Sequence, residues 1–198
     1  MAPTLLPPEE VEPENRAEWR AWLSQNHASA RAVWLVLRKK TAPEPNLTWA
    51  EAVQEALCYG WIDSVGRKLD ETRSRLYFTP RKRGSGWSAV NKNHIERLVA
   101  AGQMTAAGQA RIDAAKADGS WTLLDSVEAL EVPGDLAAAL NAVPGALEQW
   151  NAFPGSAKKG ILQWIVQAKT APTRAKRITQ TAELAAQSIR ANTWKPRG

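Results

Sequence analysis

The sequence predicts an α+β protein that is predominantly helical, with a small antiparallel sheet of about three strands packed by helices and a helical C-terminal segment. Three observations lead to this prediction. Apolar residues recur at helical spacing along most of the chain. Runs rich in β-branched and aromatic residues lie between residues 32 and 80. Pro-Gly pairs divide the last third. We expect a flexible tail at 1–13, an α+β domain at 14–132 and a helical region at 133–198, packed on the domain.

Local signals define the elements of the α+β domain. Trp19, Trp22 and Leu23 lie at helical spacing and predict the first helix. Thr48 and Glu51 form a capping box, in which the hydroxyl accepts from a backbone N–H and the carboxylate reaches back, so another helix begins there. The predicted elements are a helix at 14–25, a strand at 32–39, a helix from 48 to 60, strands at 61–68 and 73–80 joined by a polar turn, and helices at 88–101 and 105–117.

From residue 122 onward the sequence is typical of helices separated by turns. Proline cannot continue a helix, and a glycine after it allows the chain to turn. The predicted helices lie at 122–130, 134–142, 145–152, 156–168 and 172–191.

Positive charge is concentrated in two zones. The chain of 198 residues has 26 Lys+Arg and 20 Asp+Glu. Residues 66–97 and 133–198 each hold nine basic and three acidic residues. Such zones attract anions such as phosphate esters or nucleic acid, unless they serve only as solvated faces.

Composition excludes several classes of protein and site. Cys58 is the single cysteine, so no disulfide can form within the chain. The two histidines, His27 and His94, are distant from Cys58 in the sequence, so no metal-ligand cluster is expected. Neither histidine is expected to activate the thiol, and we expect Cys58 to be buried and inert. No apolar run reaches the ~20 residues of a membrane helix. The Pro- and Glu-rich start does not resemble a signal peptide. We expect a cytoplasmic protein without membrane insertion, and no cofactor.

The loop at 81–88 (RKRGSGWS) is the most informative local feature. A glycine-rich turn before a helix start directs backbone N–H groups outward, where the helix dipole also favours an anion. Three consecutive basic side chains would add charge-assisted hydrogen bonds, and Trp87 would offer a flat surface to a ring. The spacing is not that of a P-loop. The alternative is a basic surface turn in which Ser88 caps the next helix and Trp87 anchors the loop to the core.

Asp63 is the candidate for acid–base chemistry. A general acid or base needs a carboxyl group in a cleft with a shifted pKa. The alternative, which we favour, is a structural ion pair with Arg67, Arg75 or Arg81 that ties the sheet to the loop. No complete catalytic signature occurs in the sequence.

The C-terminal basic zone and the tryptophans bear on nucleic-acid binding. Residues 169–177 bring four basic side chains to the start of the last helix, where the dipole opposes them. They would contact phosphates or, as we favour, an internal acidic patch. Most of the ten tryptophans recur on helix or strand faces, which fits core packing better than a platform for stacked bases.

Six short motifs occur in a recognisable order along the chain: residues 55–63 (EALCYGWID), 78–81 (FTPR), 87–92 (WSAVNK), 102–108 (GQMTAAG), 163–169 (QWIVQAK) and 173–177 (TRAKR). In order and spacing they resemble the bacterial YdeI/OmpD-associated family, also called bacteriocin-protection proteins. The resemblance implies protection against bacteriocins or envelope stress, and brings no settled reaction, cofactor or catalytic residue.

The sequence therefore favours a cytosolic, non-catalytic binding protein of this stress or bacteriocin-protection type, with a site for an anionic, phosphate-bearing ligand. The alternatives are a nucleic-acid-binding protein that uses the two basic zones and an enzyme that uses Asp63. The protein partner is not indicated. The predicted ligand-binding residues form a polar-aromatic set: Trp61, Asp63, Arg81, Ser85, Trp87, Ser88, Asn91 and Lys92.

Overall fold

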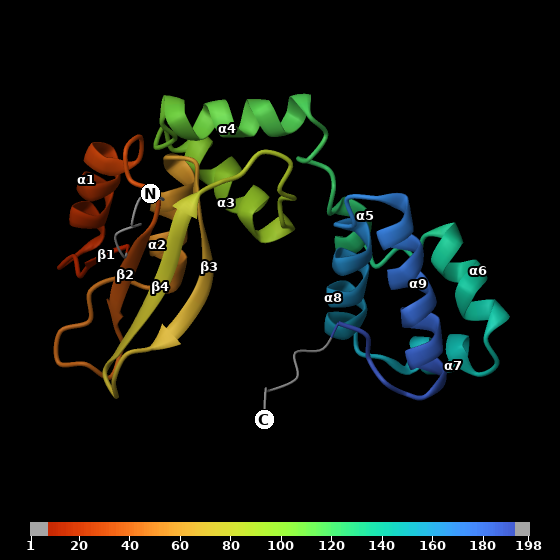
Figure 1. Cartoon of the computed structure of the whole chain (residues 1–198). Coiled ribbons are helices and arrows are strands. Elements are labelled where there is room, and N and C mark those ends of the chain that lie inside the picture. Colours follow the sequence, from red (N-terminus) through yellow and green to blue (C-terminus); the bar gives the residue numbers. More distant parts are fainter. Residues whose placement is uncertain (1–7, 193–198) are drawn as a thin grey trace, which may run out of the picture. The chain divides into compact units, whose positions relative to one another are not determined.

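The computed structural model describes residues 8–192 and confirms a predominantly helical α+β fold (Figure 1). Its contacts divide the chain into two compact units, one ending at Trp121 and the other beginning at Thr122. The first unit holds the sheet and four helices, and the described part of the second is helical.

The sheet is mixed and has four strands within the described residues, where the sequence predicts three antiparallel ones. Three strands pair antiparallel, while the short β1 pairs parallel with β2 at the edge. β1 falls in the expected flexible tail. Its sequence, Glu-Glu-Val, has no apolar alternation, and pairing with an edge of the sheet holds it in place. Residues 1–7 of that predicted tail lie outside the described residues. In spatial order the strands are β1 (Glu9–Val11), β2 (Val33–Arg38), β4 (Arg73–Pro80) and β3 (Trp61–Lys68).

Side-chain caps begin the helices of the first unit at their predicted places. Thr48 and Glu51 form the predicted capping box of α2, and the hydroxyl of Ser88 accepts from the backbone N–H of Asn91 at the start of α3. The helices are α1 (Arg16–Asn26), α2 (Trp49–Cys58), α3 (Ala89–Ala100) and α4 (Ala106–Ala117).

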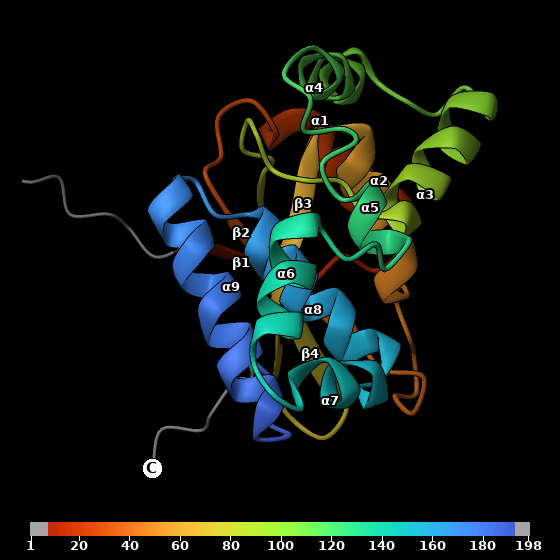
Figure 2. The same cartoon turned by 90° about the vertical axis from the view of Figure 1, so that its right-hand side faces the viewer.

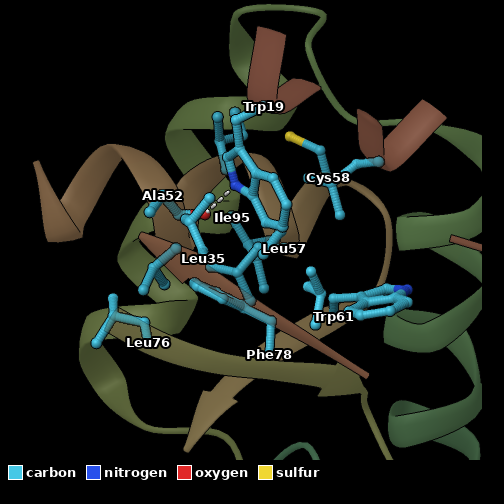
Figure 3. Close-up of a cluster of buried hydrophobic side chains, with 14 of the residues drawn as sticks. Trp19, Leu35, Ala52, Leu57, Cys58, Trp61, Leu76, Phe78 and Ile95 are labelled. Carbon is cyan, nitrogen blue, oxygen red and sulfur yellow. Dashed lines mark hydrogen bonds between the residues drawn. The ribbon is translucent and has the colours of Figure 1, made fainter. Parts of the chain in front are cut away.

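One face of the sheet carries the core of the first unit. Leu35, Leu76 and Phe78 alternate along β2 and β4 and are buried beneath the helices. Trp19 of α1 is fully buried there; its indole Nε1 donates to the carbonyl of Ala52 at 3.0 Å, and its ring lies 5.4 Å from that of Phe78 (Figure 3). The helices therefore hold the C-terminal end of β4 in place, and the loop at 81–88 begins there.

The opposite face of the sheet carries aromatic and basic side chains. Trp34 and Tyr77 are cross-strand partners with ring centroids 4.8 Å apart, and the Arg75 guanidinium lies 4.5 Å from the Trp34 ring. These rings are outside the core cluster, so core packing does not account for every tryptophan. Arg75 is itself paired with Glu10 of β1 at 2.7 Å, which ties the edge strand to this face.

The second unit has a hydrophobic core of its own around Trp150. Helix α9 packs against α6, α7 and α8 (Figure 2). Leu124 and Val127 belong to this core, which is why the division falls after Trp121 and not at the expected 132/133. The helices are α5 (Asp125–Glu128), α6 (Gly134–Ala142), α7 (Ala146–Ala152), α8 (Gly155–Val166) and α9 (Ala171–Ala186).

Among residues 8–192, none of the helices combines the length and the apolar character needed to cross a lipid bilayer.

Candidate anion-binding site

The basic loop begins where β4 ends. The backbone N–H of Arg81 donates to the carbonyl of Gly60 at 2.9 Å, which holds the loop beside the turn between α2 and β3. Gly84 has a φ of +71°, so the chain reverses there in the left-handed region that favours glycine. The loop then returns to Ser88, the cap of α3.

Arg81 is a buried cation with incomplete pairing. Its residue is 6% exposed, and the guanidinium carbon lies 3.6 Å from the centroid of the Trp87 ring. Nη2 donates to the carbonyl of Gly86 at 2.5 Å. Within the described residues 8–192, Nε and Nη1 have no hydrogen-bond partner. Burial lowers the pKa of Arg81 to about 10, although the charge of Asp63 acts in the opposite direction, so the group is still charged at neutral pH.

Arg81 lines a small hollow, called here the Arg81 hollow, together with other cations. Its volume of about 10 Å³ is room for a single water molecule. One wall is the last turn of α4, where the helix dipole favours positive charge, which explains why a basic loop packs there. The lining residues are Arg81, Lys82, Arg83, Gly84, Trp87, Arg111, Ala114, Ala115, Asp118 and Ser120.

The lowered pKa of Asp118 shows that the Arg81 hollow favours a negatively charged group. The Ser120 hydroxyl, with the backbone N–H groups of Ser120 and Gly84 and the charge of Arg83, lowers the pKa of the Asp118 carboxyl. The Ser120 N–H donates to Oδ1 at 3.0 Å. Four cations and one carboxylate line the hollow, so a net positive charge is left to attract an anion from solution.

The predicted ligand-binding residues do not form one cluster. Arg81 and Trp87 line the hollow, but Trp87 is 2% exposed and Arg81 covers one of its faces, so the predicted flat wall is wrong for this ring. The Ser85 hydroxyl donates to the Lys82 carbonyl at 2.7 Å, a contact within the loop. Lys92 lies on α3, with its ammonium 5.2 Å from the Trp121 ring.

Asp63 forms none of the ion pairs expected for it within residues 8–192. Its Oδ2 accepts from the indole Nε1 of Trp49 at 3.0 Å, and Trp49 is 53% exposed. The charge of Asp63 acts on Arg81 by coulombic attraction, which raises the pKa of the guanidinium against the effect of burial. This geometry describes a carboxylate that anchors a surface tryptophan.

Trp61 lines a second, larger space, called here the Trp61 cavity. Its volume is about 370 Å³. The Trp61 ring is buried, and its Nε1 donates to the carbonyl of His27 at 3.1 Å. The lining residues are His27, Ala28, Ala30, Tyr59, Gly60, Trp61, Pro80, Ala107, Ala110 and Arg111.

Sequence reasoning missed Arg111, Asp118 and Ser120. They come from α4 and the turn after it, about thirty residues beyond the basic loop. Arg111 stands in an otherwise ordinary helical pattern, so no local signal marks it. Only the packing of α4 against the end of α2 brings these residues to the loop.

Other candidates have structural explanations. Burial raises the pKa of the Cys58 thiol, in agreement with the expected inert thiol. Glu55 is buried, but it pairs with Arg16 at 2.5 Å and Arg20 at 2.6 Å. In the second unit, Arg174 donates two hydrogen bonds to Asp135, so an internal carboxylate partner exists for the C-terminal basic zone.

Comparison with protein families assigns both units. Residues 11–111, just over half of the chain, match the family model described as a domain of unknown function, DUF8412. Residues 129–188 match the model described as bacteriocin-protection, YdeI or OmpD-associated. Neither the curated proteins nor the solved structures contain a match. The chain thus belongs to the DUF8412 family, whose model covers just over half of it, and residues 129–188 of its second unit match the model of the bacteriocin-protection, YdeI or OmpD-associated family.

Proposed function

We propose that the chain is a non-catalytic binding protein of the YdeI/OmpD-associated type, which holds an anionic, phosphate-bearing ligand at the Arg81 hollow. One observation carries the proposal: Arg81 is a buried guanidinium with two nitrogens, Nε and Nη1, that have no hydrogen-bond partner within residues 8–192. A buried charge without its hydrogen bonds is costly, and an incoming oxygen anion would relieve that cost. The cytosolic location expected from the sequence is part of this proposal.

The neighbours of Arg81 support an anion over a neutral ligand. Lys82, Arg83 and Arg111 surround the hollow and are exposed, so their side chains can move toward a ligand at its mouth. A guanidinium binds phosphate oxygens in a bidentate manner. Because the hollow holds about one water, we expect one phosphate oxygen to enter it while the rest of the group stays at the mouth. The turn at Gly84 would shift to admit it.

Replacing Arg81 by methionine is the direct test. Arg81→Met keeps an unbranched side chain over Trp87 and removes the charge, and we expect the affinity for inorganic phosphate and pyrophosphate to fall at least tenfold. The reason is that a hydrogen bond to a charged group contributes about 1.5–3 kcal/mol. Titration calorimetry of the full chain at constant ionic strength measures the change.

The matched control is Arg97→Met. Arg97 lies in the last turn of α3, is exposed and does not line the hollow, so the variant loses the same charge elsewhere. If both variants weaken binding equally, or if the unaltered chain binds neither anion, the proposal is wrong. Arg111→Met, at an exposed position, should also weaken binding, and it keeps the test open if Arg81→Met does not fold.

A further inference from the structure

We infer that the ligand is a ring-bearing phosphate ester, the class that includes the nucleoside monophosphates, and that its ring lies in the Trp61 cavity while its phosphate lies at the Arg81 hollow. This inference rests on the proposed function and adds the second half of the ligand.

The two spaces adjoin through consecutive and shared residues. Pro80 lines the Trp61 cavity and Arg81, the next residue, lines the hollow. Arg111 lines both. The hydrogen bond from the Arg81 N–H to the Gly60 carbonyl joins the two walls directly. The two spaces therefore lie on either side of the exposed Arg111 side chain, and a ligand that occupied both would extend past this side chain.

The Trp61 cavity has the size and lining that a flat ring requires. Its volume of about 370 Å³ lies in the range of ordinary ligand pockets, about 300–1,000 Å³. His27 and Tyr59 are partly exposed and supply aromatic surface, the buried Trp61 ring lies behind them, and the remaining wall is largely alanine. The hollow, at about 10 Å³, cannot hold a ring. The geometry thus assigns the charged end and the ring end of the ligand to different places.

A polar group is available to the ring as well. Nδ1 of His27 lies 2.9 Å from the carbonyl of Leu23, and because a carbonyl only accepts, Nδ1 donates this bond. Nε2 of the neutral imidazole is then an acceptor. An amino group on a heterocycle, such as that of adenine, is the complementary donor.

The backbone at Gly60 sets the position of Arg111. Gly60 has a φ of +73°, and a Cβ there would lie 2.5 Å from Cγ of Arg111. The stem of Arg111 therefore passes directly over the glycine, which brings a cation from α4 to the boundary between the two spaces. A phosphate at this boundary would meet the Arg111 charge, and an attached ring would continue toward Tyr59.

Four probes separate the two halves of the ligand. We expect the full chain to bind adenosine 5′-monophosphate at least tenfold more tightly than ribose 5-phosphate, which lacks the base, and at least tenfold more tightly than adenosine, which lacks the phosphate. Inorganic phosphate gives the affinity of the anion site alone. Titration calorimetry at constant ionic strength measures all four.

Two alanine-to-leucine variants on α4 locate the ring. Ala110 and Ala106 are both exposed, but only Ala110 lines the cavity. Ala110→Leu should remove the advantage of the monophosphate over ribose 5-phosphate and leave the affinity for inorganic phosphate unchanged. Ala106→Leu should change neither.

The outcomes distinguish this inference from the proposed function. Phosphate binding that depends on Arg81, with no gain from the base, would overturn the ring assignment and leave the anion site intact. The ring assignment would also be overturned if Ala110→Leu still bound adenosine 5′-monophosphate more tightly than ribose 5-phosphate, or if Ala106→Leu lost this preference equally. Either result would place the ring elsewhere. Adenosine that binds as tightly as its monophosphate would overturn the anion site instead.

Discussion

Trp19→Ala should lower the free energy of unfolding by about 3–5 kcal/mol, the usual cost of truncating a buried tryptophan. Trp19 is 0% exposed and lies at the centre of the core of the first unit. The change removes ring contacts with Trp22 and Phe78, and it leaves the Ala52 carbonyl without its indole donor. Urea unfolding followed by far-UV circular dichroism measures the loss.

Trp49→Ala is the matched control, since it deletes the same side chain from a position that is 53% exposed. Its cost should be about 1 kcal/mol or less, because the hydrogen bond from Trp49 to Asp63 is open to solvent. Equal losses in the two variants would show that the structure misplaces the centre of the core.

Gly108→Ala should destabilise the chain by about 1–3 kcal/mol, although alanine is the better helix former. A Cβ at Gly108 would lie 2.3 Å from the carbonyl oxygen of Cys58 and 2.5 Å from the sulfur of Met104. The methionine can move, but the carbonyl belongs to the end of α2 and also accepts from the hydroxyl and the N–H of Thr105. The substitution must therefore push α4 away from α2.

Gly160→Ala in α8 is the matched comparison, because we expect it to raise the free energy of unfolding. Among residues 8–192, no atom lies within 4 Å of a Cβ built on Gly160, so this variant should gain about 0.5–1 kcal/mol from helix propensity. Urea unfolding of both variants gives the two values. Because α4 carries Arg111, Gly108→Ala should also weaken phosphate binding, whereas Gly160→Ala should not. A stabilised Gly108→Ala variant would contradict the close approach of the two helices.

Local signals predicted most of the elements because local interactions form them. The strands at 61–68 and 73–80 have the predicted bounds. Asp70 makes the turn between them by accepting from the backbone N–H groups of Thr72 and Arg73. The caps at Thr48 and Ser88 act over three residues. In each case the sequence holds both partners of the interaction within one short segment.

Interactions between distant segments could not be predicted in this way. β1 exists because it pairs with β2, some twenty residues further along, and its own residues do not favour a strand. The candidate site depends on the same kind of contact. The sequence identified Arg81 and its loop, but Arg111 and Asp118 reach them only through the packing of α4 on α2. Trp87, predicted to offer a surface, is buried: its ring belongs to the core cluster of the first unit, and Arg81 covers one of its faces.

The single cysteine lies at this junction, since Cys58 is the last residue of α2 and its carbonyl anchors α4. Its thiol is buried and burial raises its pKa, so it does not react while the two helices are in contact. A thiol-specific dye would consequently label a molecule only once the helices part. The labelling rate, measured with and without phosphate, would report how often α4, the helix that carries Arg111, separates from α2.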